Sequence, residues 1–500
     1  MLIGFDLGTT NCKAFVFDDY GKILGSATDE YPIISTQPGY AEQDAELLWK
    51  ISKSVIGQAI KKSGVSSVKA LSISVQGDAV IPVARNFQPL CSAILGMDYR
   101  SLPQTQECLQ IFGKDKLFQI TGMPPHPINA LTKILWIREN HPEIAEHTWK
   151  FMTYADFLMG KLGADPVIDY SMASRTMGFS LKEKDWSLDI LEPLGLNVEQ
   201  FSQPEPSGKV VGRLSSVLLE EFGLKGETLL VSGGHDQTCA GIGAGLIHEG
   251  IGVDSTGTAE VLSTVFSNPL LNQRMLESYY PCYIHAKADQ YFTFSLNHTG
   301  GVVYQWFRDQ LAEWEKREAS KSGVSAYEIL NKKMPDYPTR LFIFPHFNGS
   351  GSPTCDLASK GTVFGLTLNT TKYELARAFL EGLTYELRLN LETMQEAGIE
   401  IGELIAVGGG AKSSRWLEIK ADITNRPVKI LCNSEAACMG AAMLAGIGSG
   451  VYSNFEEAAG ACVKYAGVYE PTKSTAALYE ERYRIYRDLY ETVLKLNHTI

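Results

Sequence analysis

The stretch that decides the fold is Ile3-Gly4-Phe5-Asp6-Leu7-Gly8-Thr9-Thr10-Asn11, close to the first residue. An apolar run meets an acidic residue, breaks at a glycine and ends in polar side chains. Residues 13–18 then form a second apolar run, so the segment is predicted to be a β-hairpin. The hairpin tip offers backbone N–H groups, hydroxyls and one carboxylate, which suit a polyphosphate held with Mg²⁺. An ordinary hairpin with a polar turn fits the same residues.

The second half of the chain opens in the same way as the first. Ile251-Gly252-Val253-Asp254-Ser255-Thr256-Gly257-Thr258 echoes residues 3–10. Two halves that each begin with an apolar strand and a Gly/Thr turn indicate duplicated α/β domains. We therefore expect domains at residues 1–247 and 248–500, with the two turns facing each other. Chance similarity over so short a segment is the alternative.

Bulk composition narrows the class of protein. The 500 residues are 44% hydrophobic and 20% charged, which is typical of a globular protein with more than one domain. A net charge of −12 without a basic cluster argues against a nucleic-acid surface. No apolar run is long enough to span a bilayer, and Asp6 stands where a signal peptide needs apolar residues. We expect a cytoplasmic protein without membrane contact.

The nine cysteines are scattered without CxxC pairs. An odd number of unpaired cysteines is typical of reduced thiols, so neither a disulfide framework nor a zinc site is predicted.

Familiar phosphate-binding motifs are missing from the sequence. No segment fits the GxxxxGK[ST] frame, and residues 241–245 lack the third glycine of a dinucleotide fingerprint. Three glycine-bearing turns after predicted strands are left, at Gly8, Gly257 and residues 408–410. Each can bring the main chain close to a ligand.

Asp236 is the candidate general base. It follows the apolar run 228–232 and the pair Gly233-Gly234, and it precedes a helix of small residues. A carboxylate at such a strand end can accept a proton from a substrate hydroxyl within hydrogen-bond reach. A plain helix cap is the alternative, because Asp is a favoured N-cap residue.

Several motifs, in order along essentially the whole chain, resemble the FGGY family of carbohydrate kinases. The resemblance is carried by two phosphate loops at residues 6–10 and 254–258, two signatures at 133–140 and 361–381, and an adenosine loop at 408–416. Two positions depart from the family signatures, Ala130 and Phe379.

The resemblance implies an α/β protein with the actin-like ATPase fold, built from two RNase H-like domains around a central cleft. It implies ATP and Mg²⁺, with Asp236 as catalytic base and Asp6 near the metal. A small-molecule sugar or polyol is the implied partner, and a homodimer is a candidate assembly. The residues it places near the nucleotide are Thr9, Thr10, Asn11, Thr258, Gly301, Gln305, Gly409, Gly410 and Ser414.

The substrate is less well specified. Glycerol kinases carry an Arg-Glu pair, a Trp and a Tyr where this chain has Gly77-Asp78, Gly96 and Ile128. We therefore expect a roomier pocket that does not favour glycerol. The candidate sugar contacts are Gln76, Gly77, Asp78, Asp98, Arg100 and Asp236. A surface position for Arg100 fits equally well.

A kinase for a xylulose-type pentulose is the leading prediction. The match to xylulose kinases is partial, and the Gln76–Asp78 turn is similar to that of some tetritol and L-xylulose kinases. Tetritol, L-xylulose and gluconate kinases of the same family are the alternatives. An actin-like or chaperone-like ATPase that binds protein is an alternative from a different class.

Overall fold

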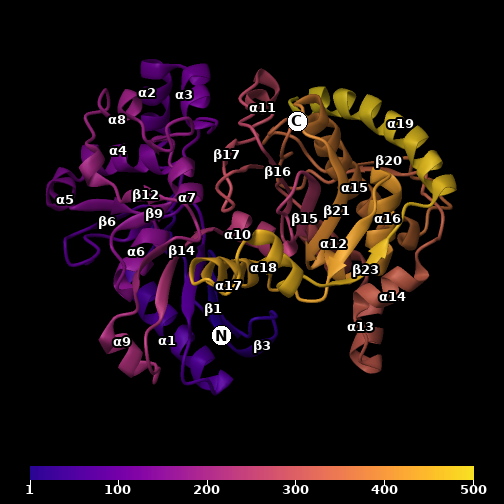
Figure 1. The fold of residues 1–500 in the computed structure, drawn as a ribbon. Coiled ribbons are helices and arrows are strands. Elements are labelled where there is room, and N and C mark those ends of the chain that lie inside the picture. Colours follow the sequence, from indigo (N-terminus) through magenta and orange to yellow (C-terminus); the bar gives the residue numbers. More distant parts are fainter. Residues whose placement is uncertain (500) are drawn as a thin grey trace.

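The computed structural model describes residues 1–499, and two large mixed sheets form the cores of its two lobes (Figure 1). In the first sheet, β1, β2 and β3 are antiparallel neighbours, while β5 runs parallel to β1 and β14 parallel to β5. The strand order is β13 (Val210–Arg213), β14 (Leu229–His235), β5 (Ala70–Val75), β1 (Leu2–Leu7), β2 (Asn11–Phe17) and β3 (Ile23–Glu30).

The second sheet repeats this arrangement. Its strands β15, β16 and β18 form the antiparallel part, and β21 and β22 continue it in parallel. The strand order is β17 (Tyr283–Ile284), β18 (Tyr291–Asn297), β16 (Glu260–Phe266), β15 (Gly250–Thr256), β21 (Ile401–Gly408), β22 (Val428–Leu431) and β23 (Tyr465–Tyr469). The repeated opening segment thus begins two lobes that share one topology.

The opening segment forms the predicted hairpin, β1–β2. Ile3, Phe5 and Leu7 are buried, and β1 has β5 on one side and β2 on the other, so it lies in the middle of the first sheet. The turn closes where the Gly8 amide donates to the Asn11 carbonyl oxygen over 3.0 Å. The polar residues of the tip therefore stand at the end of a rigid central strand.

Two helices cross at the centre of the molecule, α10 (Asp236–Ala244) and α17 (Ala436–Gly448) (Figure 1). A Cβ added at Gly440 would overlap the carbonyl oxygen of Cys239, and one at Gly243 would overlap that of Ala436. Glycine is thus required for this close approach. Although α17 belongs to the second half of the sequence, it packs on β1, β5 and β14 of the first sheet.

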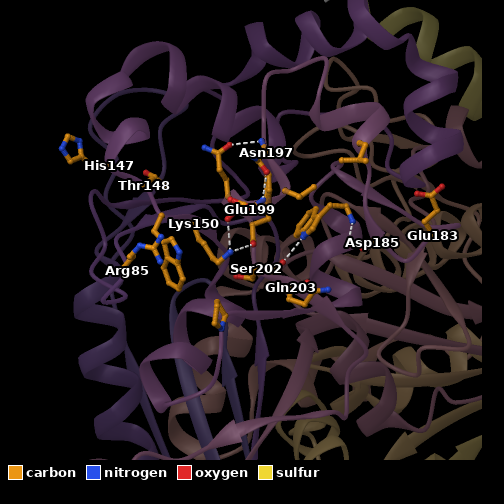
Figure 2. Close-up of a pocket in the computed structure, with 17 residues that line it drawn as sticks. Arg85, His147, Thr148, Lys150, Glu183, Asp185, Asn197, Glu199, Ser202 and Gln203 are labelled. Atoms are coloured by element: carbon orange, nitrogen blue, oxygen red, sulfur yellow. Dashed lines mark hydrogen bonds between the residues drawn. The ribbon is translucent and has the colours of Figure 1, made fainter.

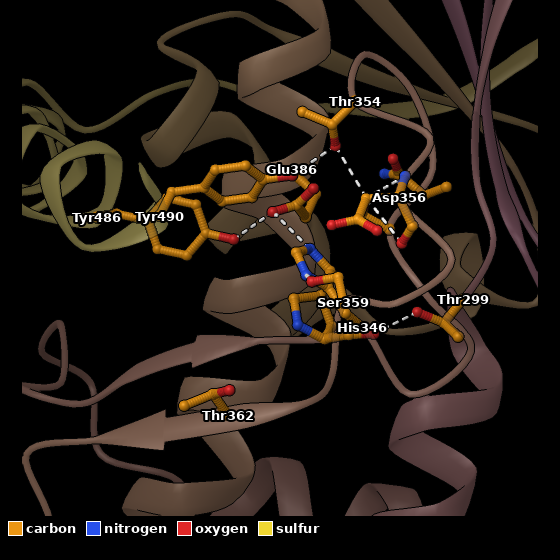
Figure 3. Close-up of polar contacts among 12 residues, drawn as sticks. Thr299, His346, Thr354, Asp356, Ser359, Thr362, Glu386, Tyr486 and Tyr490 are labelled. Atoms are coloured by element: carbon orange, nitrogen blue, oxygen red, sulfur yellow. Dashed lines mark hydrogen bonds and ion pairs between the residues drawn. The ribbon is translucent and has the colours of Figure 1, made fainter. Parts of the chain in front are cut away.

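The C-terminal helix α19 (Lys473–Asn497) runs along the outside of the second lobe (Figure 1). Its tyrosines 479, 483 and 486 are buried against Tyr385 of α15 (Lys372–Glu396), and Tyr490 packs against Phe344, so this stripe is part of the core of the second lobe. Figure 3 shows the polar contacts at its end: Tyr486 donates to Glu386, and the Tyr490 and Thr354 hydroxyls lie 2.9 Å apart.

Insertions surround the first sheet. Residues 150–230 contain short strands as well as helices and loops. The elements are β4 (Glu42–Gln43), α1 (Ala45–Ser63), β6 (Ile81–Val83), β7 (Ala93–Ile94), α2 (Leu102–Phe112), α3 (Lys114–Thr121), α4 (Ala130–Asn140), α5 (Pro142–His147), β8 (Lys150–Met152), α6 (Tyr154–Leu162), β9 (Val167–Asp169), α7 (Tyr170–Arg175), β10 (Phe179–Ser180), β11 (Asp185–Trp186), α8 (Leu188–Leu191), the 3₁₀ turn Val198–Gln200, β12 (Gln203–Glu205) and α9 (Ser216–Glu221).

The second lobe has its own additional elements. They are α11 (Gln273–Glu277), α12 (Gly301–Leu311), α13 (Glu313–Ser322), α14 (Ala326–Lys333), β19 (Phe342–Phe344), β20 (Thr362–Phe364), the 3₁₀ turn Gly410–Lys412, α16 (Ser414–Thr424) and α18 (Phe455–Cys462). Within residues 1–499, none of the helices has the length and apolar character needed to cross a bilayer.

Candidate active site

Asp236 lies where β14 ends and α10 begins. The strand runs through both glycines to His235, further than the apolar run predicted, and its pairing with β5 is irregular between Val231 and Gly234. About 30% of the Asp236 side chain is exposed. Burial of the rest, with a smaller effect of Asp6, raises the pKa of Asp236 to about 7 against the opposing charge of Arg175. A carboxyl with this pKa can exchange a proton near neutral pH.

The helix-cap alternative for Asp236 has little structural support. The N-cap position of α10 is His235, and no side chain caps this helix within the described part of the chain. Nε2 of His235 lies 3.1 Å from Oδ1 of Asp236, and its Nδ1 lies 3.1 Å from the hydroxyl of Tyr283. Burial and Arg175 lower the pKa of His235 well below its usual range, so the imidazole is neutral. Tyr283 belongs to β17, so the second lobe reaches the surroundings of Asp236.

Asp6 lies near the end of β1, with its Oδ1 accepting from the Ser74 hydroxyl over 2.6 Å. Burial raises its pKa to about 6, against the effects of Ser74 and Lys13. A nearby cation would favour the charged carboxylate. The site therefore suits a hydrated divalent cation that also contacts a phosphate.

The hairpin tip beside Asp6 is held by its own hydrogen bonds. Tyr31 donates to the carbonyl oxygens of Gly8 and Asn11 over 2.6 and 2.8 Å, and Gln43 donates to that of Thr9 over 2.6 Å. The side chain of Thr10 is exposed. The tip thus presents Thr9, Thr10 and Asn11 from a fixed backbone.

A cavity of about 470 Å³ lies in the second lobe, between the β15–β16 turn, α12, α14 and the loop after β21. Of the predicted nucleotide residues, Thr258, Gly301, Gln305, Gly409 and Gly410 line it. Ser413 lines it as well, and Ser414 follows as the first residue of α16.

Tyr327 and Asn331 are among the lining residues of this cavity that the sequence analysis missed. Tyr327 and Asn331 come from α14, a peripheral helix without a recognised motif. Asn331 donates to the Ser413 hydroxyl over 3.0 Å, so this helix is tied to the adenosine loop. Their contribution depends on tertiary packing, which gives no local sequence signal.

Lys420 of α16 contacts polar side chains at both ends of the second phosphate loop. Its ammonium group is buried, forms an ion pair with Asp254 and donates to Thr256 and Glu260 over 2.7 and 2.9 Å. Asp254 is the counterpart of Asp6 in the repeat, and its charge is neutralised within the protein. Asp6 has no such lysine ion pair within residues 1–499, so the two halves differ in the carboxylate they offer a metal.

The predicted sugar residues follow two different patterns. Gln76 donates to Gln43 over 2.9 Å, and Asp78 forms an ion pair with Arg175 of α7. Asp98 and Arg100 instead satisfy each other: Arg100 Nε lies 2.9 Å from Asp98 Oδ1. Arg100 is buried rather than on the surface, pairs with Glu42 over 2.6 Å and stacks on Tyr40 at 3.8 Å. The structure therefore connects Asp78 to the surroundings of Asp236 more directly than it connects Asp98.

A larger cavity, about 1450 Å³, lies elsewhere in the first lobe (Figure 2). Arg85, Lys150, Asp185 and Asn197 are among its lining residues, and Lys150 is bonded to the carbonyl oxygens of Glu199 and Phe201. None of the predicted site residues lines it. Size alone therefore does not mark the candidate site.

Two lobes of one topology, each with a Gly/Thr loop at the end of its first strand, define the actin-like ATPase fold. The fold by itself does not specify the reaction. Residues 1–243 match the N-terminal domain of the FGGY family of carbohydrate kinases, and residues 252–449 match its C-terminal domain. The chain therefore belongs to the FGGY family of carbohydrate kinases, and it is an ATP-dependent sugar kinase.

Relatives with different substrates in their names are similar to this chain. A xylulose kinase of Bacillus subtilis is 29% identical over 498 residues, covering 99% of this chain and 98% of the relative. A glycerol kinase of Saccharolobus islandicus is 31% identical over 466 residues, covering 91% and 89%. A gluconokinase of Bacillus subtilis is 26% identical over 461 residues, also covering 91% and 89%.

Solved structures support the fold. A ligand-bound xylulose kinase from Lactobacillus acidophilus has a TM-score of 0.89 at 24% identity, covering 98% of both chains. A gluconate kinase from the same organism also has a TM-score of 0.89 at 24% identity, covering 98% of this chain and 97% of the other. Backbone similarity thus does not separate the substrates.

Proposed function

We propose that the chain transfers the γ-phosphate of ATP to a hydroxyl of a ketose or linear polyol, with a xylulose-type pentulose as the leading substrate. The observation that carries the proposal is Asp236, a partly exposed carboxylate whose pKa is raised to about 7. The negative charge of Asp6, in the first phosphate loop, contributes to that rise. Xylulose kinases at about 30% identity over nearly the whole chain support the choice of substrate.

In this mechanism Asp236 accepts the proton of the attacking hydroxyl as its oxygen bonds to the γ-phosphorus of ATP, and the bond from that phosphorus to the bridging oxygen breaks so that ADP leaves. The hairpin tip at Thr9–Asn11 and the loop at Thr258 hold the phosphates from the two lobes. Gly301, Gln305, Gly409, Gly410 and Ser414 hold the rest of the nucleotide. Positioning and charge neutralisation supply most of the acceleration in phosphoryl transfer.

Mg²⁺ is part of the proposal, with Asp6 as its protein residue. The ion would neutralise charge on the β- and γ-phosphates when bound. A single carboxylate suffices because Mg²⁺ keeps waters and takes phosphate oxygens as further ligands.

The remaining parts of the proposal concern organisation. We place the domain boundary at residues 247/248 and propose a cytoplasmic enzyme without nucleic-acid or membrane partners. A homodimer is the proposed assembly, and light scattering of the purified chain measures it.

A substrate panel tests the activity. ADP release is measured with pentuloses, hexuloses, tetritols and gluconate, each against a sugar-free control. We expect the largest stimulation with a xylulose-type pentulose; a preference for a tetritol or gluconate would replace the leading substrate by that alternative. The absence of stimulation by every compound would contradict the proposed activity.

Asp236→Asn tests the base. We expect a loss of about 10²- to 10⁴-fold in kcat, because the amide cannot accept the proton, with ADP affinity unchanged. Asp44→Asn is the matched control: Asp44 caps α1 by accepting from the Glu46 and Leu47 amides. If Asp236→Asn keeps the wild-type kcat and loses only stability, as expected of Asp44→Asn, then Asp236 has a structural role and is not the base.

A further inference from the structure

Asp169, the last residue of β9, and Ser171, in the first turn of α7, form a buried hydrogen-bonded pair. The Ser171 hydroxyl donates to Asp169 Oδ1 over 2.5 Å, and the Met172 amide donates to the same oxygen over 3.0 Å. An ionised carboxylate only accepts hydrogen bonds, so the single proton of the serine is committed to Asp169. The Ser171 oxygen therefore remains as an acceptor for other groups.

The group that uses this acceptor is the main chain directly before Asp236. The His235 amide donates to Ser171 Oγ over 2.9 Å. On the other side of the same residue, the His235 carbonyl oxygen accepts from the Thr238 hydroxyl over 2.8 Å. Both polar main-chain groups of His235 are thus held by side chains, one from α7 and one from α10. Because the direction of a side chain depends on the backbone dihedrals, these two hydrogen bonds restrict where Asp236 points.

The end of β14 depends on support of this kind, because it is not a regular strand. Its pairing with β5 is irregular between Val231 and Gly234. An irregularity of this type disrupts the ladder of hydrogen bonds that fixes a strand. A Cβ at Gly234 would lie 3.2 Å from Ser171 Oγ and 3.1 Å from Thr238 Oγ1, so both hydroxyls lie directly against the strand. The hydrogen bond from His235 to Ser171 thus adds a constraint where the ladder is weakest.

Helix capping explains only part of this arrangement. Asp169 is the N-cap residue of α7, for which the Met172 amide is the ordinary partner. Ser174 of the same helix behaves as helical serines usually do, since it donates to the carbonyl oxygen of Tyr170, four residues earlier. Ser171 instead directs its proton to Asp169 and accepts from β14. Its hydrogen bonds therefore join two elements and do more than complete one helix.

We propose that Asp169 and Ser171 are positioning residues for the proton transfer, which hold Asp236 in the direction from which it accepts the proton of the substrate. This inference rests on the proposed function and assigns no new reaction. The Asp169 carboxylate orients the Ser171 hydroxyl, the hydroxyl fixes the His235 amide, and the main chain transmits this constraint to Asp236. A misplacement of about 1 Å at a reacting group can cost about 10²-fold in rate, so the pair contributes to kcat although neither side chain contacts the substrate.

The test measures kcat and KM of Ser171→Ala with the best compound of the substrate panel, and it counts active sites by the stoichiometry of ADP binding. We expect kcat per ADP-binding site to fall about 10- to 100-fold, while KM for that compound and for ATP stays within about twofold. A loss of folded protein alone would lower the number of sites and leave kcat per site unchanged. Ser171→Thr keeps the hydroxyl and should bring kcat back to within about threefold of wild type.

Ser202→Ala is the matched control. Ser202 is also buried in the first lobe, and it donates to Asp156 Oδ2 over 2.6 Å. Burial raises the pKa of Asp156 and of Asp169 to about 6, so the two serines face similar carboxyls. Within residues 1–499, however, the Ser202 side chain bonds to neither β14 nor α10. We expect Ser202→Ala to keep the wild-type kcat per site.

A double-variant cycle tests whether the pair acts as a unit. Asp169→Ala should lower kcat about as much as Ser171→Ala, and the double variant should lose no more than either one, because both act through one chain of hydrogen bonds. If Ser171→Ala does not fold, Ser171→Cys keeps the shape of the side chain; its kcat should fall too, since a thiol is a weak donor and acceptor.

The possible failures of this inference and of the proposed function are distinguishable. A wild-type kcat per site in folded Ser171→Ala or Ser171→Cys, an equal loss in Ser202→Ala, or additive losses in the double variant would overturn the positioning role and leave Asp236 as the base. Absence of sugar-dependent turnover in wild type, or a full kcat in Asp236→Asn, would instead contradict the proposed function.

Discussion

At the scale of single residues, the proton on Asp236 should set the pH dependence. Its pKa is raised to about 7, so the carboxyl is protonated at lower pH and cannot accept a proton. We expect kcat/KM for the sugar to rise about tenfold per pH unit below pH 7 and to level off above it. A pH–rate profile of wild type measures this, with ADP binding over the same range as control. A flat profile through pH 6 to about 8 would assign the base to another group.

The sequence analysis located the site residues that stand in a recognisable local pattern, an apolar strand followed by turn residues. Asp6 and Asp236 each stand at the end of an apolar strand, where turn residues follow, and the structure has both at such ends. Arg175, His235 and Tyr283 were missed as part of the site. Their contacts join α7, β14 and β17. These segments are far apart in the sequence, so no local sequence pattern predicts that they are in contact.

At the scale of elements, the crossing of α10 and α17 should depend on its glycines. Gly440→Ala places a methyl group against the Cys239 carbonyl oxygen, so the helices must separate. We expect a loss of about 1–3 kcal/mol in the free energy of unfolding, measured in urea. Gly460→Ala in α18 is the control, because a Cβ there meets nothing within 4 Å and alanine favours a helix. Equal stability of the two variants would show that the crossing adapts freely.

Long periodic elements were predicted well and short ones poorly. Residues 372–396 form α15, whose 25 residues of sustained helical periodicity outweigh any local ambiguity in the sequence. The two- and three-residue strands inside residues 150–230 carry too few residues to show an alternation. β14 continues through Gly233, where a Cβ would overlap the carbonyl oxygen of Ile73, so a glycine is needed beside β5. This constraint comes from tertiary packing and leaves no local pattern in the sequence.

At the scale of the whole molecule, binding of the two substrates should be coupled. The proposed sugar groups belong mainly to the first lobe and the nucleotide cavity to the second, while Tyr283 bridges them at His235. We expect the sugar to tighten ADP binding about 5- to 150-fold, and ADP to tighten sugar binding by the same factor. Titration calorimetry with and without each partner measures both. Factors within about twofold of one would mean that the lobes bind independently.

The packing of α17 on the first sheet has a consequence for how the protein is made. During translation β1, β5 and β14 leave the ribosome at least 200 residues before α17, the helix that covers them, because β14 ends at His235 and α17 begins at Ala436. N-terminal segments generally begin to fold first during synthesis. Here an apolar face of the first lobe stays uncovered until residues 436–448 emerge from the ribosome. This face includes Leu2, Ala70 and Val231. Final packing of the first lobe therefore comes late in synthesis, and the nascent chain exposes this apolar face until α17 emerges.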